Sequence, residues 1–409
     1  MGGVKQSMLE EESRGVWPPD DSYVCANCLE EEGLQKFIAE NATHHECTYC
    51  GRQSNTVIAC SMESMCEHIL KSIYTEYGSA DDECVPYDSR EGGYQLPTFD
   101  TYDLLEELGV SAGSHNLFMA IVNALPDHTW SRRDPFFARQ DQRFVFGWKA
   151  FCRLVMHTSR YVFFKGRYII DEPNHPDTID PVEILKIIGS LVQELDLART
   201  ISQPQSIFRV RIVESCEHPS TAKELGAPPL EYCTISNRMS PAGISMFYGA
   251  FDRETAIKET YERCDEVKKA VIGEFTPTRP LRVLDFSSVH APPSIFDVDN
   301  RHRRSSAIFL QNFIHDIAKP IKRIARAHID YVPTQIVTEY LRLVFLIEEK
   351  YEVDGIIYPS AKNSGERAIV IFADNNQCLD LNVSESSNGS NNVLRLVKIE
   401  ERLLQPTPH

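Results

Sequence analysis

The 409-residue sequence lacks the marks of several protein classes. No uninterrupted apolar run is long enough to span a bilayer, and the first residues lack the apolar core of a secretory signal peptide. The myristoylation pattern fails because Gln6 stands where Ser or Thr is required. No G-x-G-x-x-G follows a predicted strand, which argues against a Rossmann hydride-transfer enzyme. We therefore expect a soluble, cytoplasmic protein that contacts no membrane.

Positive charge is also scarce. The chain has 42 Lys and Arg against 59 Asp and Glu, a net charge of −17 at pH 7. Such an acidic chain is a poor general partner for nucleic acid. The sequence is 42% hydrophobic and 25% charged, which is typical of globular cores, and no internal repeat is visible. Its length predicts about two or three domains.

Four of the twelve cysteines form the strongest local motif. Cys25 and Cys28 make one CxxC pair, and Cys47 and Cys50 make a second after eighteen intervening residues. Each pair offers two thiolates to one ion, so the four predict a closed, tetrahedral, structural Zn²⁺ site. The alternatives are disulfides, which a cytosolic setting disfavours, and free thiols, which the paired spacing disfavours. A thioredoxin-type redox motif would need a single CxxC in a βαβ context.

The N-terminal half is predicted to be mostly helical beyond the cysteines. Residues 1–22 are acidic and irregular, and residues 200–205 read as a linker. Asp180, Pro181 and Glu183 have the spacing of a capped helix start. Apolar periodicity predicts helices over residues 61–77, 102–108, 115–125, 144–156 and 180–197. The 144–156 helix is expected to point Trp148, Phe151 and Val155 inward.

The C-terminal half is organised around residues 238–260. This stretch opens with a turn in which Pro241 fixes one dihedral angle and Gly243 permits a positive φ. A strand is expected next, over residues 244–251, and it carries Tyr248.

A helix is expected to follow this strand. Asp252 takes its N-cap position, and its apolar stripe predicts that it continues to about Val271. Glu259 then lies about two turns into the helix. Taken alone, Tyr248 is typical of a core or edge aromatic. With Arg263 one turn on, Glu259 is typical of a solvated helix face.

The remaining pattern is mixed and gives an α+β fold class for the whole chain. Helices are predicted over 305–317 and 333–347, and strands over 281–286, 355–358, 368–372 and 393–399. The strands at 355–358 and 368–372 are predicted to form an antiparallel pair joined by a turn.

The residues Arg238, Pro241-Ala242-Gly243, Tyr248 and Glu259 have a spacing that resembles the signature of the RES domain, a family named for its Arg, Glu and Ser. Three further pieces match in order: Phe208-Arg209-Val210-Arg211, Gly226-Ala227-Pro228-Pro229 and Asp354-Gly355-Ile356-Ile357-Tyr358-Pro359-Ser360-Ala361. The resemblance spans residues 206–404. RES toxins degrade NAD⁺, and their mixed α/β fold is similar to that of ADP-ribosyltransferases. The resemblance therefore implies that NAD⁺ is a consumed substrate.

The resemblance also implies roles for individual residues. Glu259 would stabilise the oxocarbenium-like ribosyl centre. Arg209 would hold the NAD⁺ pyrophosphate, and Arg211 is the alternative because both stand in the same motif.

Three further residues complete the implied site. Arg238 would assist in binding, Tyr248 would contact the nicotinamide end, and Ser360 would hydrogen-bond the dinucleotide. Each has an ordinary alternative: Arg211 and Arg238 could pair with acidic surface residues, and Ser360 could only shape a turn.

The N-terminal part is similar to the HEPN/RES N-terminal domain that accompanies some RES domains. The similarity rests on the cysteine pairs, on Glu91-Gly92-Gly93-Tyr94 and on the tract from Trp148 to Arg160. HEPN ribonucleases have a wider spacing than the three residues that separate Arg153 from His157. We therefore expect a structural bundle without a ribonuclease site, in which His157 is a packed residue at a helix end. The predicted parts are a flexible N-terminus (1–22), a zinc-ribbon-like module (23–55), the helical domain (56–200) and the RES domain (206–404).

The resemblance implies an NAD⁺ phosphorylase, a transferase that forms nicotinamide and ADP-ribose-1″-phosphate from NAD⁺ and phosphate. It would act as a toxin or defence effector, gated by its N-terminal part in response to an antitoxin or activating partner. An ADP-ribosyltransferase and an NAD glycohydrolase are the enzymatic alternatives. In a different class, the zinc module and bundle would form a recognition protein with an inactive RES domain. A homo-oligomer stays open.

Overall fold

The structure is a computed structural model that describes residues 15–165, 179–261, 267–318, 326–381, 383 and 391–405. Packing divides the chain into two compact units. The first, unit 1, comprises the chain up to Arg139 together with Pro292–Ser305, and the second, unit 2, comprises the rest. Within the described ranges, no helix is both long and apolar enough to cross a membrane.

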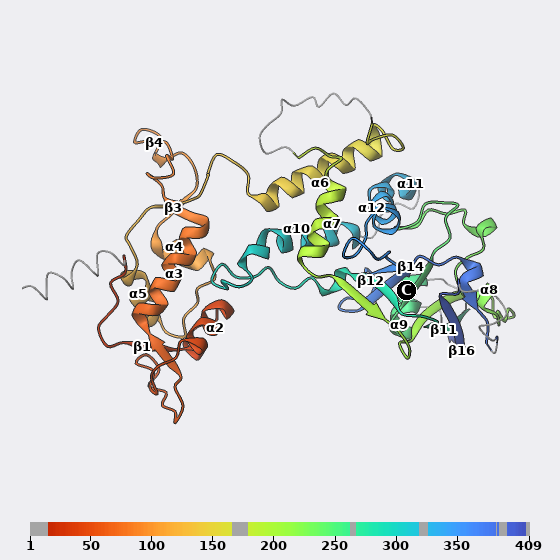
Figure 1. Ribbon diagram of the computed structural model, residues 1–409, viewed down its shortest axis with the longest axis horizontal. Helices are drawn as coiled ribbons and strands as arrows, with labels where there is room; N and C mark the ends of the chain where they lie inside the picture. Colours follow the sequence, from red (N-terminus) through yellow and green to blue (C-terminus); the bar gives the residue numbers. More distant parts are fainter. Residues whose placement is uncertain are drawn as a thin grey trace, which may run out of the picture. The chain divides into compact units, whose positions relative to one another are not determined.

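Unit 1 is built from short elements around its own core (Figure 1). Ser61, Asp100 and Ser114 cap three of its helices by accepting a hydrogen bond from the backbone three residues on. The helices are η1 (Ala26–Cys28), α2 (Glu32–Glu40), α3 (Met62–Glu76), α4 (Thr101–Glu107) and α5 (His115–Ala124). The strands are β1 (Tyr23–Cys25), β2 (Ala59–Ser61), β3 (Tyr77–Ser79), β4 (Tyr87–Asp88), β5 (Gly93–Tyr94), β6 (Thr98–Phe99) and β7 (Trp130–Arg132).

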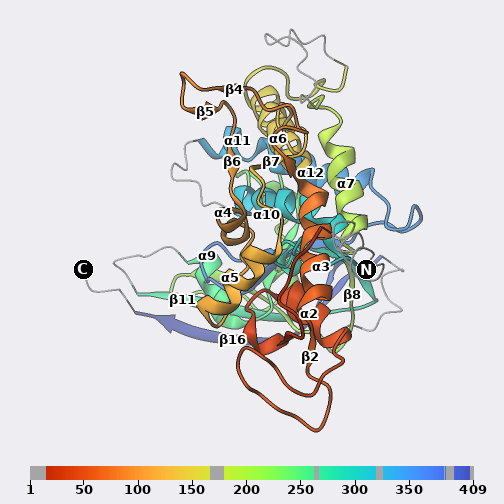
Figure 2. The same cartoon turned by 90° about the vertical axis from the view of Figure 1, so that its left-hand side faces the viewer.

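Unit 2 is organised by one nine-stranded mixed sheet, in the order β15-β16-β11-β9-β10-β14-β13-β12-β8. Two of its pairs are parallel, β12 with β13 and β15 with β16, and the others are antiparallel. The long strands β11 and β16 run side by side (Figure 2). The strands are β8 (Ala198–Ile201), β9 (Ile207–Val213), β10 (Phe247–Ala250), β11 (Lys268–Pro277), β12 (Leu281–Asp285), β13 (Gly355–Pro359), β14 (Arg367–Ile371), β15 (Cys378–Leu379) and β16 (Leu394–Leu404).

Helices cover both faces of this sheet. The helices are α6 (Gln140–His157), α7 (Ile184–Glu194), α8 (Ala222–Leu225), α9 (Arg253–Thr260), α10 (Arg304–Ala318), α11 (Ala327–Asp330) and α12 (Val332–Leu343). Residues of α6, α7, α10 and α12 share one apolar core with β10, β13 and β14. Helix α8 packs in a second core, with Phe247 and Phe275. Helix α9 packs on Phe208 and Val210 of β9.

Several predicted elements are confirmed. Helices are found where the pattern predicted them over 115–125, 144–156 and 305–317. Asp252 caps α9, with its Oδ1 accepting from the Thr255 N–H at 2.8 Å. Strands β13 and β14 pair antiparallel, as the motif and turn indicated.

The predicted continuation of α9 to Val271 is wrong. The helix ends at Thr260, and Val271 lies in β11, opposite Arg211 on one side and Glu401 on the other. Residues 269–273 are all buried between the two neighbouring strands. Non-local ladder bonds and β-branched packing therefore outweigh the local helical pattern there. Cys264 of the predicted stripe lies outside the described residues.

Other boundaries also differ. The strand predicted from Ile244 begins at Phe247, because the turn closed by the Ile244 N–H on the Pro241 carbonyl and the irregular residues 244–246 precede it. The α7 helix begins at Ile184, because Asp180 Oδ1 accepts from the Val182 N–H and forms a turn first. The α12 helix ends at Leu343.

A glycine in the DGIIYPSA motif is required by close strand packing. A Cβ built on Gly355 would lie 2.5 Å from the Val370 carbonyl oxygen of the neighbouring strand. Gly355→Ala is therefore expected to lower the free energy of unfolding by about 1–3 kcal/mol. Urea unfolding of both proteins measures this. Gly113→Ala, whose Cβ would meet nothing closer than 3.7 Å, is the control, and equal losses in the two variants would contradict the packing argument.

Candidate functional site

A carboxylate on α9 meets the end of β13. Glu259 is half-buried, and its Oε1 accepts a hydrogen bond from Ser360 Oγ at 2.5 Å. Ser360 follows β13 and is only 8% exposed. Its hydroxyl oxygen also accepts from the backbone N–H groups of Lys362 and Asn363, at 3.3 and 3.0 Å. These two donors turn the Ser360 hydroxyl proton toward the carboxylate.

The turn after β13 also holds the helix itself. Asn363 Nδ2 donates to Thr255 Oγ1 at 2.7 Å, and Thr255 is fully buried. Lys258 Nζ donates to Asn363 Oδ1 at 2.8 Å, and Lys362 Nζ donates to the Glu259 carbonyl at 3.3 Å. The position of Glu259 is therefore fixed by contacts to three residues of its own helix.

Two tyrosines lie on the sheet face that carries this carboxylate. Tyr248 of β10 shares a hydrogen bond of 2.9 Å with the Ser240 hydroxyl, and burial raises the pKa of Tyr248 to about 12. Burial also raises the pKa of Tyr358 on β13, and the nearby Glu259 charge raises it further. Both phenols are protonated at neutral pH and can donate hydrogen bonds.

Arg238 borders the same cluster. Its charge opposes the rise in the pKa of Tyr358, and its guanidinium lies 6.0 Å from the centre of the Tyr331 ring. Its Nη1 donates to the Ile317 carbonyl, and Thr334 Oγ1 donates to the Arg238 carbonyl at 2.5 Å. Arg238 therefore brings positive charge to the sheet face that carries Glu259.

Arg209 and Arg211 extend from the opposite face of β9. Phe208 and Val210 pack toward α9, so the alternating residues point the other way. Arg209 Nη1 donates to the Tyr248 carbonyl at 2.7 Å, and burial lowers the pKa of Arg209 to about 10. Arg211 is exposed and donates to the Glu224 carbonyl at 2.6 Å.

The structure thus brings some of the predicted residues together and not others. Ser360 bonds Glu259 directly, and Tyr248 and Arg238 surround the same cluster through Tyr358. Arg209 touches Tyr248 only at its backbone, and Arg211 belongs to the other face.

Sequence reasoning missed Tyr358, Tyr331 and Asn363. Tyr358 could have been predicted, because it lies two residues before Ser360 and alternate residues of a strand point to the same face. Tyr331 and Asn363 come from turns, and no periodic pattern indicates their positions.

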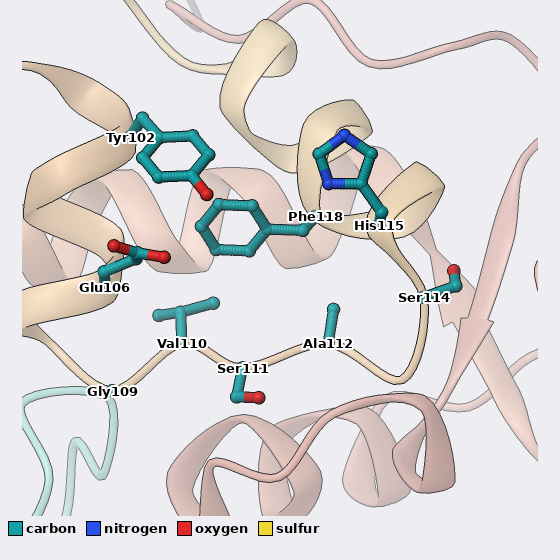
Figure 3. A pocket seen from close by; sticks show the side chains of 9 residues that line it. All are labelled: Tyr102, Glu106, Gly109, Val110, Ser111, Ala112, Ser114, His115 and Phe118. Carbon is teal, nitrogen blue, oxygen red and sulfur yellow. The ribbon is translucent and has the colours of Figure 1, made fainter.

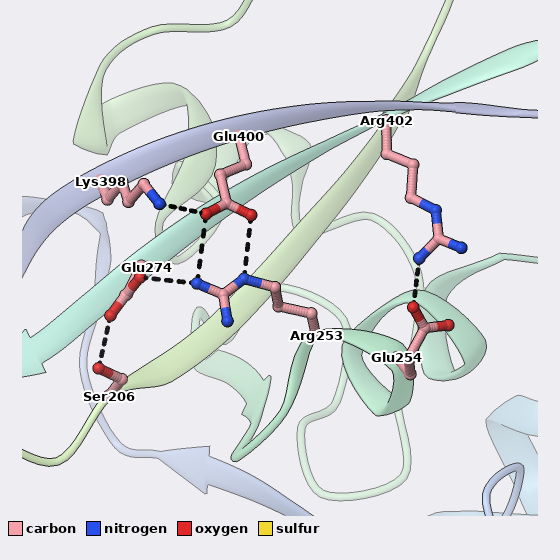
Figure 4. Close-up of polar contacts among 7 residues, drawn as sticks. All are labelled: Ser206, Arg253, Glu254, Glu274, Lys398, Glu400 and Arg402. Carbon is pink, nitrogen blue, oxygen red and sulfur yellow. Dashed lines mark hydrogen bonds and ion pairs between the residues drawn. The ribbon is translucent and has the colours of Figure 1, made fainter.

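Ion pairs anchor the start of α9 to the sheet (Figure 4). Arg253 donates to both oxygens of Glu400, at 3.0 and 3.2 Å, and to Glu274 at 3.2 Å. Its guanidinium also lies 4.3 Å from the centre of the Phe208 ring. The first residue of the helix is therefore fixed on β9, β11 and β16.

Unit 1 holds the four predicted cysteines in one cluster. The Sγ atoms are 3.6 Å apart for Cys25 and Cys28, 3.7 Å for Cys25 and Cys50, and 3.7 Å for Cys28 and Cys47. All four lie within 4.8 Å of one another. A tetrahedral ion with metal–sulfur bonds of about 2.3 Å needs sulfur separations of about 3.8 Å. The cluster could therefore hold a metal ion.

The backbone also prepares this cluster for a cation. The Cys25 N–H donates to Cys47 Sγ at 3.4 Å. Burial opposes the ionisation of Cys47, but the backbone N–H groups of Cys50, Cys25 and Tyr49 outweigh it and lower the pKa of Cys47 to about 7. Burial raises the pKa of Cys25 and Cys28. Part of the cluster is thus ready to lose its protons to a metal.

The Arg153 and His157 pair lies at the C-terminal end of α6. Both side chains are exposed, so His157 is not the packed helix-end residue that we expected. The neighbouring Trp148, Phe151 and Val155 are buried, as predicted.

Fold and site together define an α+β protein with a large mixed sheet, a helix-borne carboxylate on one sheet face and a four-cysteine cluster in the other unit. Comparison with protein families finds the RES domain over residues 210–390 and the HEPN/RES N-terminal domain 1 over residues 40–168. The chain therefore contains a RES domain and, N-terminal to it, a HEPN/RES domain. Neither the curated proteins nor the solved structures contain a match to it.

The Arg253 anchor predicts a measurable loss of stability. Arg253→Ala removes two ion pairs and a ring contact, and its 41% exposed side chain limits the loss to about 1 kcal/mol. Arg402→Ala is the matched control, because Glu254 is the only ion-pair partner of Arg402 among the described residues and Arg402 is more exposed. Chemical unfolding should show a loss below about 0.5 kcal/mol for the control. A control loss as large as that of Arg253→Ala would contradict the anchor.

Proposed function

We propose that the RES domain cleaves NAD⁺ at the nicotinamide–ribose bond, with inorganic phosphate as acceptor. The observation that carries this proposal is the Glu259 carboxylate, which Ser360 orients near the protonated Tyr358, with Tyr248 on the same sheet face. A RES domain indicates an enzyme that acts on NAD⁺ in general. The products would be nicotinamide and ADP-ribose-1″-phosphate.

The chemistry matches this set of side chains. Nicotinamide leaves NAD⁺ as a neutral molecule from a cationic ring, so the reaction needs no general acid. The ribosyl carbon develops positive charge, and a fixed carboxylate lowers the energy of that state. Glu259 supplies the charge, and Ser360 positions it. The dinucleotide contact that the motif implied for Ser360 stays a prediction.

The tyrosines and arginines would bind the substrate. Tyr248 and Tyr358 can donate to the nicotinamide end, since both stay protonated. Arg209 and Arg238 have no carboxylate partner within the described residues, and a desolvated guanidinium is stabilised by an anion. Arg238 shares the face of Glu259 and is the first candidate for the pyrophosphate. Arg209, on the far side of Tyr248, is the second.

We further propose that the cysteine cluster holds a structural Zn²⁺. Four thiolates around one ion leave no open position, so the metal would stabilise the fold of unit 1 without taking part in the reaction. A RES-type toxin or defence effector, restrained by a partner, is the biological role that we propose for the whole chain.

The mechanism predicts the effect of removing one charge. Glu259→Gln keeps the shape of the side chain, so NAD⁺ binding should persist while turnover falls by about 10²–10³. Phosphate-dependent loss of NAD⁺ from purified protein measures turnover. Glu254→Gln, on the same helix but outside the cluster, is the control and should keep wild-type activity. Thermal melts check folding, and a folded, fully active Glu259→Gln variant would defeat the mechanism.

The acceptor can be read from the fate of labelled NAD⁺. Label should move into a small phosphorylated product when phosphate is present. Label in protein or nucleic acid would instead support an ADP-ribosyltransferase, and free ADP-ribose would support a glycohydrolase.

Metal analysis tests the zinc proposal. Purified protein should contain about one zinc per chain, and replacing Cys25, Cys28, Cys47 and Cys50 by Ser should remove it. The change should also lower the melting temperature, because the bound metal would stabilise the fold of unit 1. Cys84→Ser, an exposed cysteine outside the cluster, is the control. Metal-free protein with an unchanged melting temperature would contradict the site.

A further inference from the structure

Unit 1 contains a cavity that the RES reaction does not use. It has a volume of about 400 Å³, which is within the range of small-molecule sites. In Figure 3 the rings of Tyr102 and Phe118 form one side, and the chain from Val110 to Ala112 forms the other. Helix α4 contributes Tyr102 and Glu106, and α5 begins at the opposite end.

The aromatic side of the cavity favours a flat ligand. The Tyr102 and Phe118 rings meet edge to face, with centroids 5.0 Å apart and an interplanar angle of 84°. Such a pair leaves the face of one ring available to a stacked planar group. The Glu106 charge raises the pKa of the Tyr102 hydroxyl, so this group remains a hydrogen-bond donor.

The charge of the cavity disfavours anions. Its nine lining residues include the Glu106 carboxylate but neither Lys nor Arg. A phosphate or carboxylate in the cavity would therefore meet the Glu106 charge, and His115 is the one lining side chain that can become cationic. The ligand that fits is uncharged or cationic.

The floor of the cavity offers a backbone donor and acceptor. The Glu30 N–H donates to the Ser111 carbonyl at 3.0 Å, and the Gly113 N–H donates to the Cys28 carbonyl at 2.8 Å. In this antiparallel arrangement the N–H and C=O of Ala112 itself point away from Leu29. Within the described part of the chain neither group has a partner. One extended residue thus presents a neighbouring donor and acceptor, the pattern that pairs with an amide or nucleobase edge.

We propose that this cavity binds a planar nitrogen heteroaromatic, uncharged or cationic, that pairs with the Ala112 backbone and donates an N–H to Glu106. A nucleobase and an aromatic carboxamide share this chemistry. The floor is hydrogen-bonded to the segment that begins at Cys28, so the four-cysteine cluster supports the cavity. The cavity lies in unit 1 and is independent of the proposed reaction, and substitutions in the cavity separate its binding from binding at the RES site.

Calorimetric titration of the full-length chain tests the proposal with two matched pairs of probes. These are adenosine with AMP, and nicotinamide with nicotinate. We expect saturable binding below about 1 mM for adenosine, for nicotinamide or for both, and at least about tenfold weaker binding of the anionic member of that pair. The pair that binds identifies the source of the ligand. Saturable binding by neither uncharged probe, or equal binding of an anion and its neutral counterpart, would overturn the proposal.

Two substitutions locate the binding. Glu106→Gln and Tyr102→Ala should each weaken binding about tenfold, because they remove the acceptor and the stacking ring. Glu107→Gln changes the next carboxylate on α4, which does not line the cavity, and should alter binding by less than about twofold. Glu106 is exposed, so its substitution leaves folding intact. Wild-type affinity in both cavity variants would place the ligand elsewhere and refute the site.

Discussion

The hydrogen bond from Ser360 to Glu259 is the contact on which the candidate site depends. A half-buried carboxylate is stable only where donors replace its lost water. Here the donor comes from the end of β13, while the acceptor comes from a helix that follows β10. The bond therefore requires α9 to be held firmly on the sheet. Asp252 and Arg253 fix its start, and Asn363 fixes its middle by bonding Thr255.

The alternation of strand residues then decides what surrounds this carboxylate. Tyr248 and Tyr358 lie on the side of the sheet that carries α9, whereas Phe247 and Arg209 lie on the side that carries α8. The sequence motif does not show this division, because neighbouring residues of a strand point to opposite faces of the sheet. The two arginines next to Tyr248 differ for the same reason. Arg238 lies in the segment before β10, on the side of Glu259. Arg209 lies on the other side of the sheet and donates to the Tyr248 carbonyl.

The sequence predicted the features that depend on residues close to one another in the chain. The Asp252 cap, the buried side of α6 and the spacing of the four cysteines all depend on residues close in sequence. The strand at Val271 could not be predicted, because its partners are about 60 residues before it and 130 after it in register with β9 and β16. The same holds for Ser360, whose partner Glu259 is 101 residues away in the sequence. The motif indicates that Ser360 and Glu259 belong to one site, but it does not indicate that the serine hydroxyl donates to the carboxylate.

The packing of α6 and α7 bears on how the two matched domains relate. The HEPN/RES match extends to residue 168 and so includes α6, yet α6 shares its core with strands of the RES sheet. Trp148 meets Phe313 of α10 edge to face, with ring centroids 4.9 Å apart, and Phe144 meets Phe309. The β8 strand, which follows α7, closes one edge of the sheet beside β12. A chain that began at Ser206 would lose these helices and that edge, and would expose the apolar core beneath them. The part that folds around Glu259 is therefore larger than the RES match, and any signal that displaces α6 acts on the core behind the site.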